Sequence, residues 1–344
     1  MITIKEIAST LGVSTTTVSN VIHGKTREVS PKTVEKVENY LREVHYVPNI
    51  NARNLAQNRS KIIGVVLMLY AYKDINMFVG SFVSEIIGAL EKSISDAGYF
   101  MMLYISDDAD KVISYISTWN VDGIVMFAIN DEAGLKVSRH YKKPIVFIDS
   151  YVENERKSKD TEAPFVNIAI NDEEAVYEAV QYLISRGHKK IAFLSRNMMG
   201  TDKLRYRGYL RAMEDAGIKA GDKDAIIVSA NTFDKTERRY DTLTDNASKY
   251  TAVFCCSDTS AVFLINALEK KGIHVPDDVS VIGFDDNADA QLSRPALTTI
   301  RQDINLKGKK AVESLLSMIN GTVFTSQNIV LGTKLIERGS VRDI

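Results

Sequence analysis

Four short polar side chains recur at helical spacing early in the chain: Thr15, Thr16, Ser19 and Asn20. They would share one face of a short helix whose opposite face carries valine and isoleucine. Their hydroxyl and carboxamide groups donate and accept hydrogen bonds without carrying a charge. A helix lying in the major groove of DNA presents such groups to the edges of the bases. The pattern therefore indicates a helix that reads DNA.

Two further elements must position that polar face. Thr3 and Glu6 have the spacing of a capping box, which marks the start of a helix, and apolar residues follow at helical spacing. Gly12 can take the positive φ of a tight turn, and Ser14 can cap the next helix. We predict a helix-turn-helix whose second helix spans residues 15–22. An ordinary helical hairpin inside a larger core is the alternative.

A third helix and a linker are expected next. Ser30 and Pro31 form a helix start, since a cap precedes proline at the first helical position, and an apolar stripe runs to about His45. The polar segment 49–58 is too short to be a stable helix alone and would become helical when bound. Within it, Leu55 either packs on the body or enters a DNA base step from the minor groove.

From residue 61 onward, apolar strands alternate with amphipathic helices. The predicted strands are residues 61–69, 100–105, 121–129, 144–149, 166–170, 191–195, 225–228, 252–256 and 279–284. The predicted helices include residues 82–97, 173–185, 204–216, 235–248 and 259–271. This alternation is typical of parallel sheets covered by helices on both faces. Two successive sets imply two lobes, separated in the charged stretch 153–163.

Polar residues recur just after the predicted strands. They are Asp149, Asn171, Asp172, Ser195, Arg196, Ser257, Asp258, Asp285 and Asp286, and Arg205 lies early in a helix. Ligands of such sheets bind beyond the carboxyl ends of the strands, so two lobes would enclose a ligand cleft. Arg and Asp facing one cleft suit pairs of hydroxyl groups, as in a sugar. Taken alone, each Asp is better explained as a helix cap or a loop ion pair.

Charge is unevenly distributed along the 344 residues, whose net charge is −1. Residues 1–60 carry eight Lys or Arg and five Glu, a balance of +3 against −4 for the rest. A small basic head on a mildly acidic body fits an anion-binding module joined to a separate domain. The length predicts two or three domains.

Motifs for catalysis, cofactor binding or export are not evident. The sequence has no Gly-Lys-Ser/Thr phosphate loop and no Gly-x-Ser-x-Gly elbow, and its five histidines lack metal-ligand spacing. We therefore expect no enzyme, no cofactor and no metal. No signal peptide or membrane-length apolar run is seen, which predicts a cytoplasmic protein without a membrane partner. Cys255 and Cys256 are expected to be buried small hydrophobic residues, with a vicinal redox pair as the alternative.

Several stretches resemble the lactose/galactose repressor (LacI/GalR) family of bacterial transcription regulators. They are TIKEIASTLGVSTTTVSNVIHGKTREVSPKTVEKV, VPNINARNLA, IIGVV, HKKIAFL, RYRGYLRAM, IHVPDDVSVIGFDD and RPALTTIRQD, in order along essentially the whole chain. The resemblance implies an all-α helix-turn-helix head (1–47), a hinge helix (48–60) and an α/β two-lobed body like periplasmic sugar-binding proteins (61–344). We expect lobe 1 at about 61–162 and 303–322, and lobe 2 at about 163–302 and 323–340.

The resemblance also implies DNA contacts. It places major-groove residues at Ser14, Thr15, Thr16, Thr17, Ser19 and Asn20, and hinge residues at Ala52, Arg53, Leu55 and Ala56. Thr15, Thr16 and Asn20 would read base edges, while the other three helix residues would hold phosphates or orient the helix. Asn20 stands where the family more commonly has Arg, and Asn pairs best with adenine rather than guanine. Leu55 falls at the family's minor-groove lever, which favours its wedge role.

Effector contacts are implied at Phe78, Asp149, Thr201, Arg205, Ser257, Asp258 and Asp285. Arg205 lies three residues before Gly208, as in the family, and Asp285 is the first Asp of a Gly-aromatic-Asp-Asp turn. In relatives both residues touch the effector. The first lobe departs more, because an aromatic-rich loop replaces the family's Pro-Asp and Asn-Pro-Phe-Phe before Phe78, which would stack on a ligand.

The function that the resemblance implies is that of a homodimeric, nucleoid-associated bacterial repressor of transcription. It would bind double-stranded operator DNA with an affinity set by a small-molecule effector, expected to be a sugar, between the lobes. A dimer is expected because no leucine heptad tail follows the body. The alternatives are a response to a nucleobase or to a phosphorylated carrier protein, and a solute-binding protein or enzyme that does not bind DNA.

Overall fold

The computed structural model describes residues 2–46, 59–68, 81–127, 131–150, 165–228, 240–324 and 328–344. The chain separates into two compact units, Met1–Ser60 and Lys61–Ile344. Among the described residues, no helix combines the length and the apolar character needed to cross a membrane.

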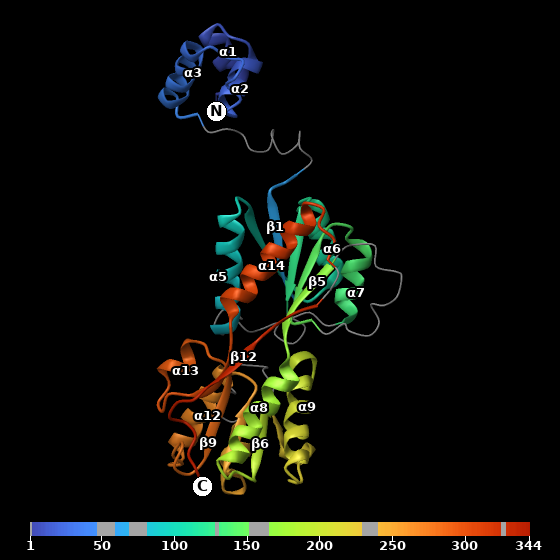
Figure 1. The fold of residues 1–344 in the computed structure, drawn as a ribbon, viewed down its shortest axis with the longest axis vertical. Coiled ribbons are helices and arrows are strands. Elements are labelled where there is room, and N and C mark those ends of the chain that lie inside the picture. Colours follow the sequence, from blue (N-terminus) through green and yellow to red (C-terminus); the bar gives the residue numbers. More distant parts are fainter. Residues whose placement is uncertain are drawn as a thin grey trace. The chain divides into compact units, whose positions relative to one another are not determined.

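The first unit contains three helices, α1 (Ile4–Leu11), α2 (Thr15–Ile22) and α3 (Pro31–Glu43) (Figure 1). Each helix contributes a fully buried side chain to one small core, namely Ile7, Val18 and Val37. Helices α1 and α2 pack against each other and against α3, so the predicted helix-turn-helix with a third helix is confirmed.

Local side-chain chemistry accounts for where these helices begin and end. Thr3 and Glu6 form the predicted capping box, and Gly12 ends α1 in the left-handed region with a φ of 64°. Such a conformation costs glycine little, because it has no Cβ. Ser14 and Ser30 accept hydrogen bonds from the backbone amides of Thr17 and Thr33, which caps α2 and α3.

The first sheet of the body is entirely parallel and has the strand order β11-β5-β4-β3-β1-β2. Its strands are β1 (Ile62–Met68), β2 (Phe100–Ser106), β3 (Gly123–Phe127), β4 (Ile145–Ile148), β5 (Phe165–Ile170) and β11 (Asn328–Leu331). Its helices are α5 (Ser81–Asp96), α6 (Ala109–Thr118), α7 (Asp131–His140) and α14 (Ile304–Ile319). Because strand side chains alternate, Val65 of β1 packs with α5 and α14, and Val66 packs with α6 and α7.

The second sheet has the order β12-β10-β9-β8-β6-β7, with only β12 antiparallel to its neighbour among the described strands. Its strands are β6 (Ile191–Ser195), β7 (Ala225–Ile227), β8 (Ala252–Cys255), β9 (Ser280–Asp285), β10 (Thr298–Gln302) and β12 (Thr333–Ile336). Its helices are α8 (Asp172–Ser185), α9 (Gly200–Asp215), α11 (Asp241–Thr244), α12 (Asp258–Lys270) and α13 (Ala288–Leu292). Helices α8 and α9 share one core with this sheet, and α11, α12 and α13 share the other. The predicted class, parallel sheets covered by helices on both faces, is confirmed.

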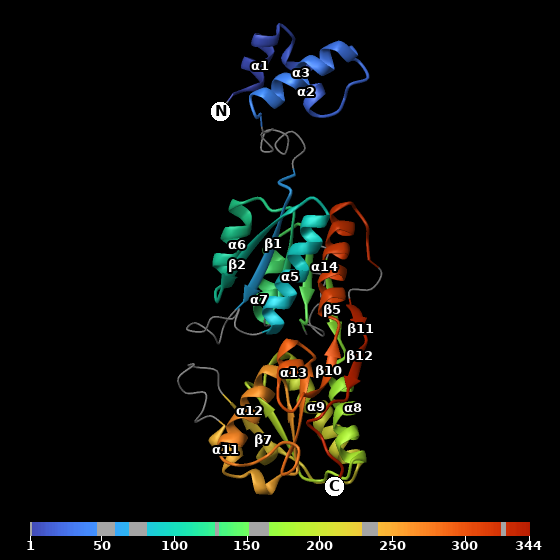
Figure 2. The same ribbon diagram turned by 90° about the vertical axis from the view of Figure 1, so that its left-hand side faces the viewer.

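Three connections join the two lobes, between β5 and α8, between β10 and α14, and between β11 and β12 (Figure 2). The first and the third differ from the sequence prediction, which assigned residues 166–170 and the chain after 323 to the second lobe. Strand β5 instead pairs with β4, and β11 pairs with β5, in the first sheet. An apolar strand is compatible with either sheet, so its pattern does not reveal its partner. The predicted break at 153–163 lies outside the described residues.

Two smaller predictions can also be compared with the structure. The predicted helix 235–248 is represented only by the four-residue α11 and a short 3-10 turn (Ala247–Lys249) in its described part. Cys255 and Cys256 are free and buried, as predicted, with exposures of 0% and 5%. Burial raises the pKa of both thiols, which disfavours the reactive thiolate.

Close packing of α8 on α9 generates the first prediction. A Cβ added at Gly208 would lie 2.2 Å from the carbonyl oxygen of Glu173 on α8, so Gly208→Ala must displace one helix. We expect it to lower the free energy of unfolding by about 1–3 kcal/mol. The matched control is Gly88→Ala in α5, where a Cβ meets nothing within 4 Å and alanine should stabilise by up to ~1 kcal/mol. Urea denaturation of both variants measures the difference, and equal effects would contradict the packing argument.

Candidate functional site

The outer face of α2 carries the polar residues that the sequence indicated. Thr15 and Thr16 are exposed, Ser19 and Asn20 are half-buried, and Val18 on the opposite face is fully buried. Four side chains with hydrogen-bonding groups are therefore available on the surface of this helix. The structure contains no DNA, so their contacts to bases stay a prediction.

Ser14 and Thr17 already bond to each other. The Ser14 hydroxyl accepts a hydrogen bond from the Thr17 amide at 3.0 Å, and the two hydroxyl oxygens lie 2.9 Å apart. These bonds hold the first turn of α2, which is consistent with the predicted role of orienting the helix. Five other predicted site residues lie outside the described residues: Ala52, Arg53, Leu55, Ala56 and Phe78.

In the body, Arg205 is the centre of a buried polar cluster. Its Nε donates to Asp172 Oδ1 at 2.8 Å, and its Nη1 donates to the carbonyl oxygen of Cys256 at 2.5 Å. The guanidinium carbon lies 3.6 Å from the centre of the Phe284 ring, a cation–π contact. Asp172 is the first residue of α8, directly after the connection from β5, so this ion pair lies within the second lobe and beside a connection between the lobes.

A second group of polar side chains adjoins the first. Asp285, at the end of β9, accepts a hydrogen bond from Gln302 Nε2 at 2.6 Å. Gln302 Oε1 in turn accepts from Lys307 at 2.5 Å, and Lys307 also bonds both carboxylate oxygens of Asp149 at 2.8 and 2.7 Å. Predicted residues Arg205, Asp285 and Asp149 are thus brought together at the carboxyl ends of strands from both sheets, where ligands of such sheets bind.

Burial dominates the electrostatics of this cluster. It raises the pKa of Asp285 to about 7, against the attraction of Arg205 and the hydrogen bond from Gln302. Burial likewise raises the pKa of Asp149, against the opposing effect of Lys307. For Arg205, burial lowers the pKa, but the carboxylates of Asp172 and Asp285 outweigh it and the net change is upward. The guanidinium is therefore a permanent cation beside a carboxyl group that can exchange a proton near neutral pH.

The other predicted effector residues lie differently. Ser257 caps α12 through its bond with the Ser260 amide. Asp258 is fully buried and accepts hydrogen bonds from Thr299 Oγ1 at 2.6 Å and from the Asn287 amide at 3.0 Å. It therefore braces the turn after β9 and does not cap α12, the helix that it begins. Thr201 is half-buried in the first turn of α9.

Sequence reasoning missed two members of the cluster, Gln302 and Lys307. Gln302 ends a strand that the sequence did not reveal, and Lys307 looked like one more surface lysine. The available signal was its register in α14, because the core residues Ile304 and Ala311 fall on the same helical face three and four residues away. Among the described residues, no group of three or more His, Cys, Asp or Glu side chains is arranged to hold a metal.

The raised pKa of Asp285 generates a prediction. Its folded pKa of about 7 lies above the ordinary 3.8, so its contribution to stability is complete below pH ~4 and is lost as the pH rises through 7. Asp285→Asn does not titrate, so its free energy of unfolding should rise relative to the unmodified chain, by up to about 4 kcal/mol, between pH 4 and 8. Urea denaturation at several pH values measures this, with the exposed Asp277→Asn as control. Parallel stability curves for Asp285→Asn and the unmodified chain would refute it.

Comparison with known proteins agrees with this organisation. Residues 3–49 match the family described as bacterial regulatory proteins, lacI family, and residues 180–341 match a periplasmic binding protein-like domain. The HTH-type transcriptional repressors PurR of Vibrio atlanticus and Mannheimia succiniciproducens are 35% and 34% identical, over the whole of both chains in each case.

Solved structures of similar proteins also span both the head and the body. A lac repressor dimer bound to operator and the anti-inducer ONPF aligns with a TM-score of 0.84 and 25% identity over 99% of each chain. The transcriptional regulator CelR in complex with cellobiose aligns with a TM-score of 0.70 and 26% identity, over 99% of this chain and 100% of CelR. Because these likenesses span both the head and the body, the chain belongs to the LacI family of bacterial regulatory proteins and is a DNA-binding transcriptional repressor.

Proposed function

We propose that the chain represses transcription as a homodimer whose two heads bind a near-palindromic operator, and that a small ligand bound between the lobes controls this binding. The observation that carries the ligand site is the buried Arg205 beside Asp285, at the carboxyl ends of strands from both sheets. Buried charged groups where two lobes join are suited to orient a polar ligand. The dimer is supported by the structural likeness to the lac repressor dimer.

Operator recognition would use the exposed face of α2 and the hinge. The Asn20 carboxamide can pair with adenine in two hydrogen bonds, and the Thr15 and Thr16 methyl groups suit thymine. The hinge would bind the central minor groove, with Leu55 entering a base step there. Since threonine discriminates weakly among bases, part of the specificity would come from the hinge and from DNA shape.

For the ligand, we propose a purine nucleobase rather than the sugar that the sequence suggested. The support is the name of full-length relatives, PurR, together with the polar groups of the cluster. A guanidinium such as Arg205 can donate to a ring nitrogen and a carbonyl oxygen of a purine, and the Asp285 carboxylate can accept from its N–H groups. A sugar remains the second candidate, because the structurally similar CelR was solved with cellobiose.

The ligand would act by biasing the relative orientation of the lobes. A ligand shifts such an equilibrium only by its difference in affinity for the two states. The resulting coupling to operator binding would be about 1–3 kcal/mol, as is typical of allosteric proteins.

The outer face of α2 generates a prediction with a matched control. Asn20→Ala should weaken operator binding by about 1–3 kcal/mol, because a bidentate contact to a base is lost. Asn39→Ala, an equally small change on the exposed side of α3, should leave the affinity unchanged. Fluorescence anisotropy titration on palindromic DNA at several salt concentrations measures both. Equal affinities for the two variants would remove Asn20 from the interface, and an affinity indifferent to salt would contradict DNA binding altogether.

The ligand site generates a second prediction. Isothermal titration of the full chain should show binding of hypoxanthine or guanine and not of cellobiose. Arg205→Gln should weaken that binding by about 1.5–3 kcal/mol, since hydrogen bonds from a charged donor are lost. Arg207→Gln, two residues along on the exposed side of α9, is the control. Binding of cellobiose alone would favour the sugar, and normal purine binding by Arg205→Gln would exclude that residue.

A further inference from the structure

Lys307 is a fully buried lysine on α14, with 0% of its side chain exposed. Lysine is almost never fully buried unless it is paired, because the ammonium group loses its hydration. Here each of the three ammonium hydrogens has an acceptor: Asp149 Oδ1 at 2.8 Å, Asp149 Oδ2 at 2.7 Å and Gln302 Oε1 at 2.5 Å. The ring of Phe82 on α5 lies 5.9 Å from Nζ. The ammonium group of Lys307 is therefore fully paired inside the protein.

The bonds of Lys307 form an unbroken path from one lobe to the other. Asp149 follows β4 of the first sheet, and α14, which carries Lys307, packs on that sheet. Gln302 ends β10 of the second sheet and donates to Asp285 at the end of β9 in the same sheet. The path Asp149–Lys307–Gln302–Asp285 thus spans the connection between β10 and α14, one of the three that join the lobes.

Lys307 also determines which way the Gln302 carboxamide points. The ammonium group has only donors, so it requires the oxygen of Gln302, and this leaves the NH₂ group facing the Asp285 carboxylate. In the reversed orientation, two donors would meet at Lys307 and two acceptors would meet at Asp285. Without the ammonium group, the first of these penalties disappears, and only the contact with Asp285 still favours this orientation of the carboxamide.

We propose that Lys307 is a positioning residue that locks the two lobes in one relative orientation, by holding Asp149 and, through Gln302, the carboxylate of Asp285. This lock, the path Asp149–Lys307–Gln302–Asp285, consists only of residues of the chain itself. It therefore does not depend on which ligand the site takes or on which operator the heads bind. A ligand that contacts Asp285 would act on this link from the second lobe, so the lock would set how strongly a ligand must bind to move the lobes.

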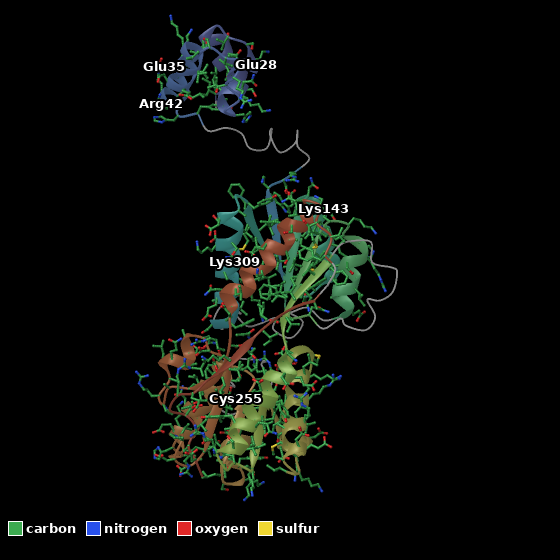
Figure 3. All side chains as sticks on the ribbon, in the orientation of Figure 1. Glu28, Glu35, Arg42, Lys143, Cys255 and Lys309 are labelled. Atoms are coloured by element: carbon green, nitrogen blue, oxygen red, sulfur yellow. The ribbon has the colours of Figure 1, made fainter. Side chains whose placement is uncertain are left out.

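The lock can be tested by measuring the interlobe distance in the full chain. Ser117→Cys on α6 and Glu214→Cys on α9 place exposed spin-label sites on the two lobes, while Cys255 and Cys256 are buried and do not compete for label. Pulsed electron paramagnetic resonance would be recorded without DNA or ligand, after dilution with unlabelled chain so that the measured label pairs lie within one chain. The variants are Lys307→Met and Gln302→Met. The control is Lys309→Met, an exposed lysine on the same helix (Figure 3).

The expected result is a single narrow distance distribution for the unmodified chain and for Lys309→Met. Lys307→Met and Gln302→Met should each broaden that distribution or add a second peak. Gln302→Met decides the outcome where Lys307→Met fails to fold, because it leaves the Lys307–Asp149 ion pair in place and breaks only the link between lobes. A narrow, unshifted distribution for Gln302→Met would overturn the proposal, as would a broad distribution for the unmodified chain. Loss of ligand or operator binding does not enter this measurement, so failure of the proposed function is distinguishable from failure of the lock.

Discussion

The body depends on the pairing of charges that are buried where its two sheets meet. A buried ion loses far more hydration energy than a single neutral contact returns, so it is tolerated only with a partner of opposite charge and satisfied hydrogen bonds. Arg205 has Asp172, and Lys307 has Asp149, each as a close ion pair. Both carboxylates follow strands of the first sheet. Arg205 and Asp172 both belong to the second lobe, because Asp172 begins α8, whereas Lys307 and Asp149 belong to the first lobe and reach the second through Gln302. Only the pairing of Lys307 therefore also joins the lobes.

The carboxyl group of Asp285 is paired differently from those of Asp149 and Asp172. It has a neutral hydrogen-bond donor, Gln302, and the nearby but already paired Arg205. Burial then outweighs these attractions, so the pKa of its carboxyl group rises to about 7. A group in this condition gains more from a new hydrogen-bond donor than one that is already ion-paired. This asymmetry makes Asp285 the member of the cluster best suited to meet a ligand.

The head is stabilised by a small core and by capped helices. Its small core contains three fully buried aliphatic side chains. Capping bonds from Thr3, Ser14 and Ser30 therefore contribute much to determining where its helices begin. The outer face of α2 presents Thr15, Thr16, Ser19 and Asn20, none of which is charged. Recognition by this face would therefore come from hydrogen bonds and methyl contacts. The head and the body have separate hydrophobic cores. A substitution that changes the specificity of one therefore need not disturb the core of the other.

Features that depend on neighbouring residues could be predicted from the sequence alone. The capping box of Thr3 and Glu6, the turn at Gly12 and the strands β1 to β9 follow from contacts within a few residues, so periodicity and cap chemistry predict them. The elements β10, β11, β12 and α14 were not predicted. The recurrence of polar residues after strands also pointed to Asp149, Asp172 and Asp285, which belong to the cluster. That β5 joins the first sheet and that Lys307 is buried became evident only in the folded chain. Lys307 meets Asp149 across 158 residues of chain, and a lysine whose partner is that distant cannot be told from a surface lysine until the fold brings the two together.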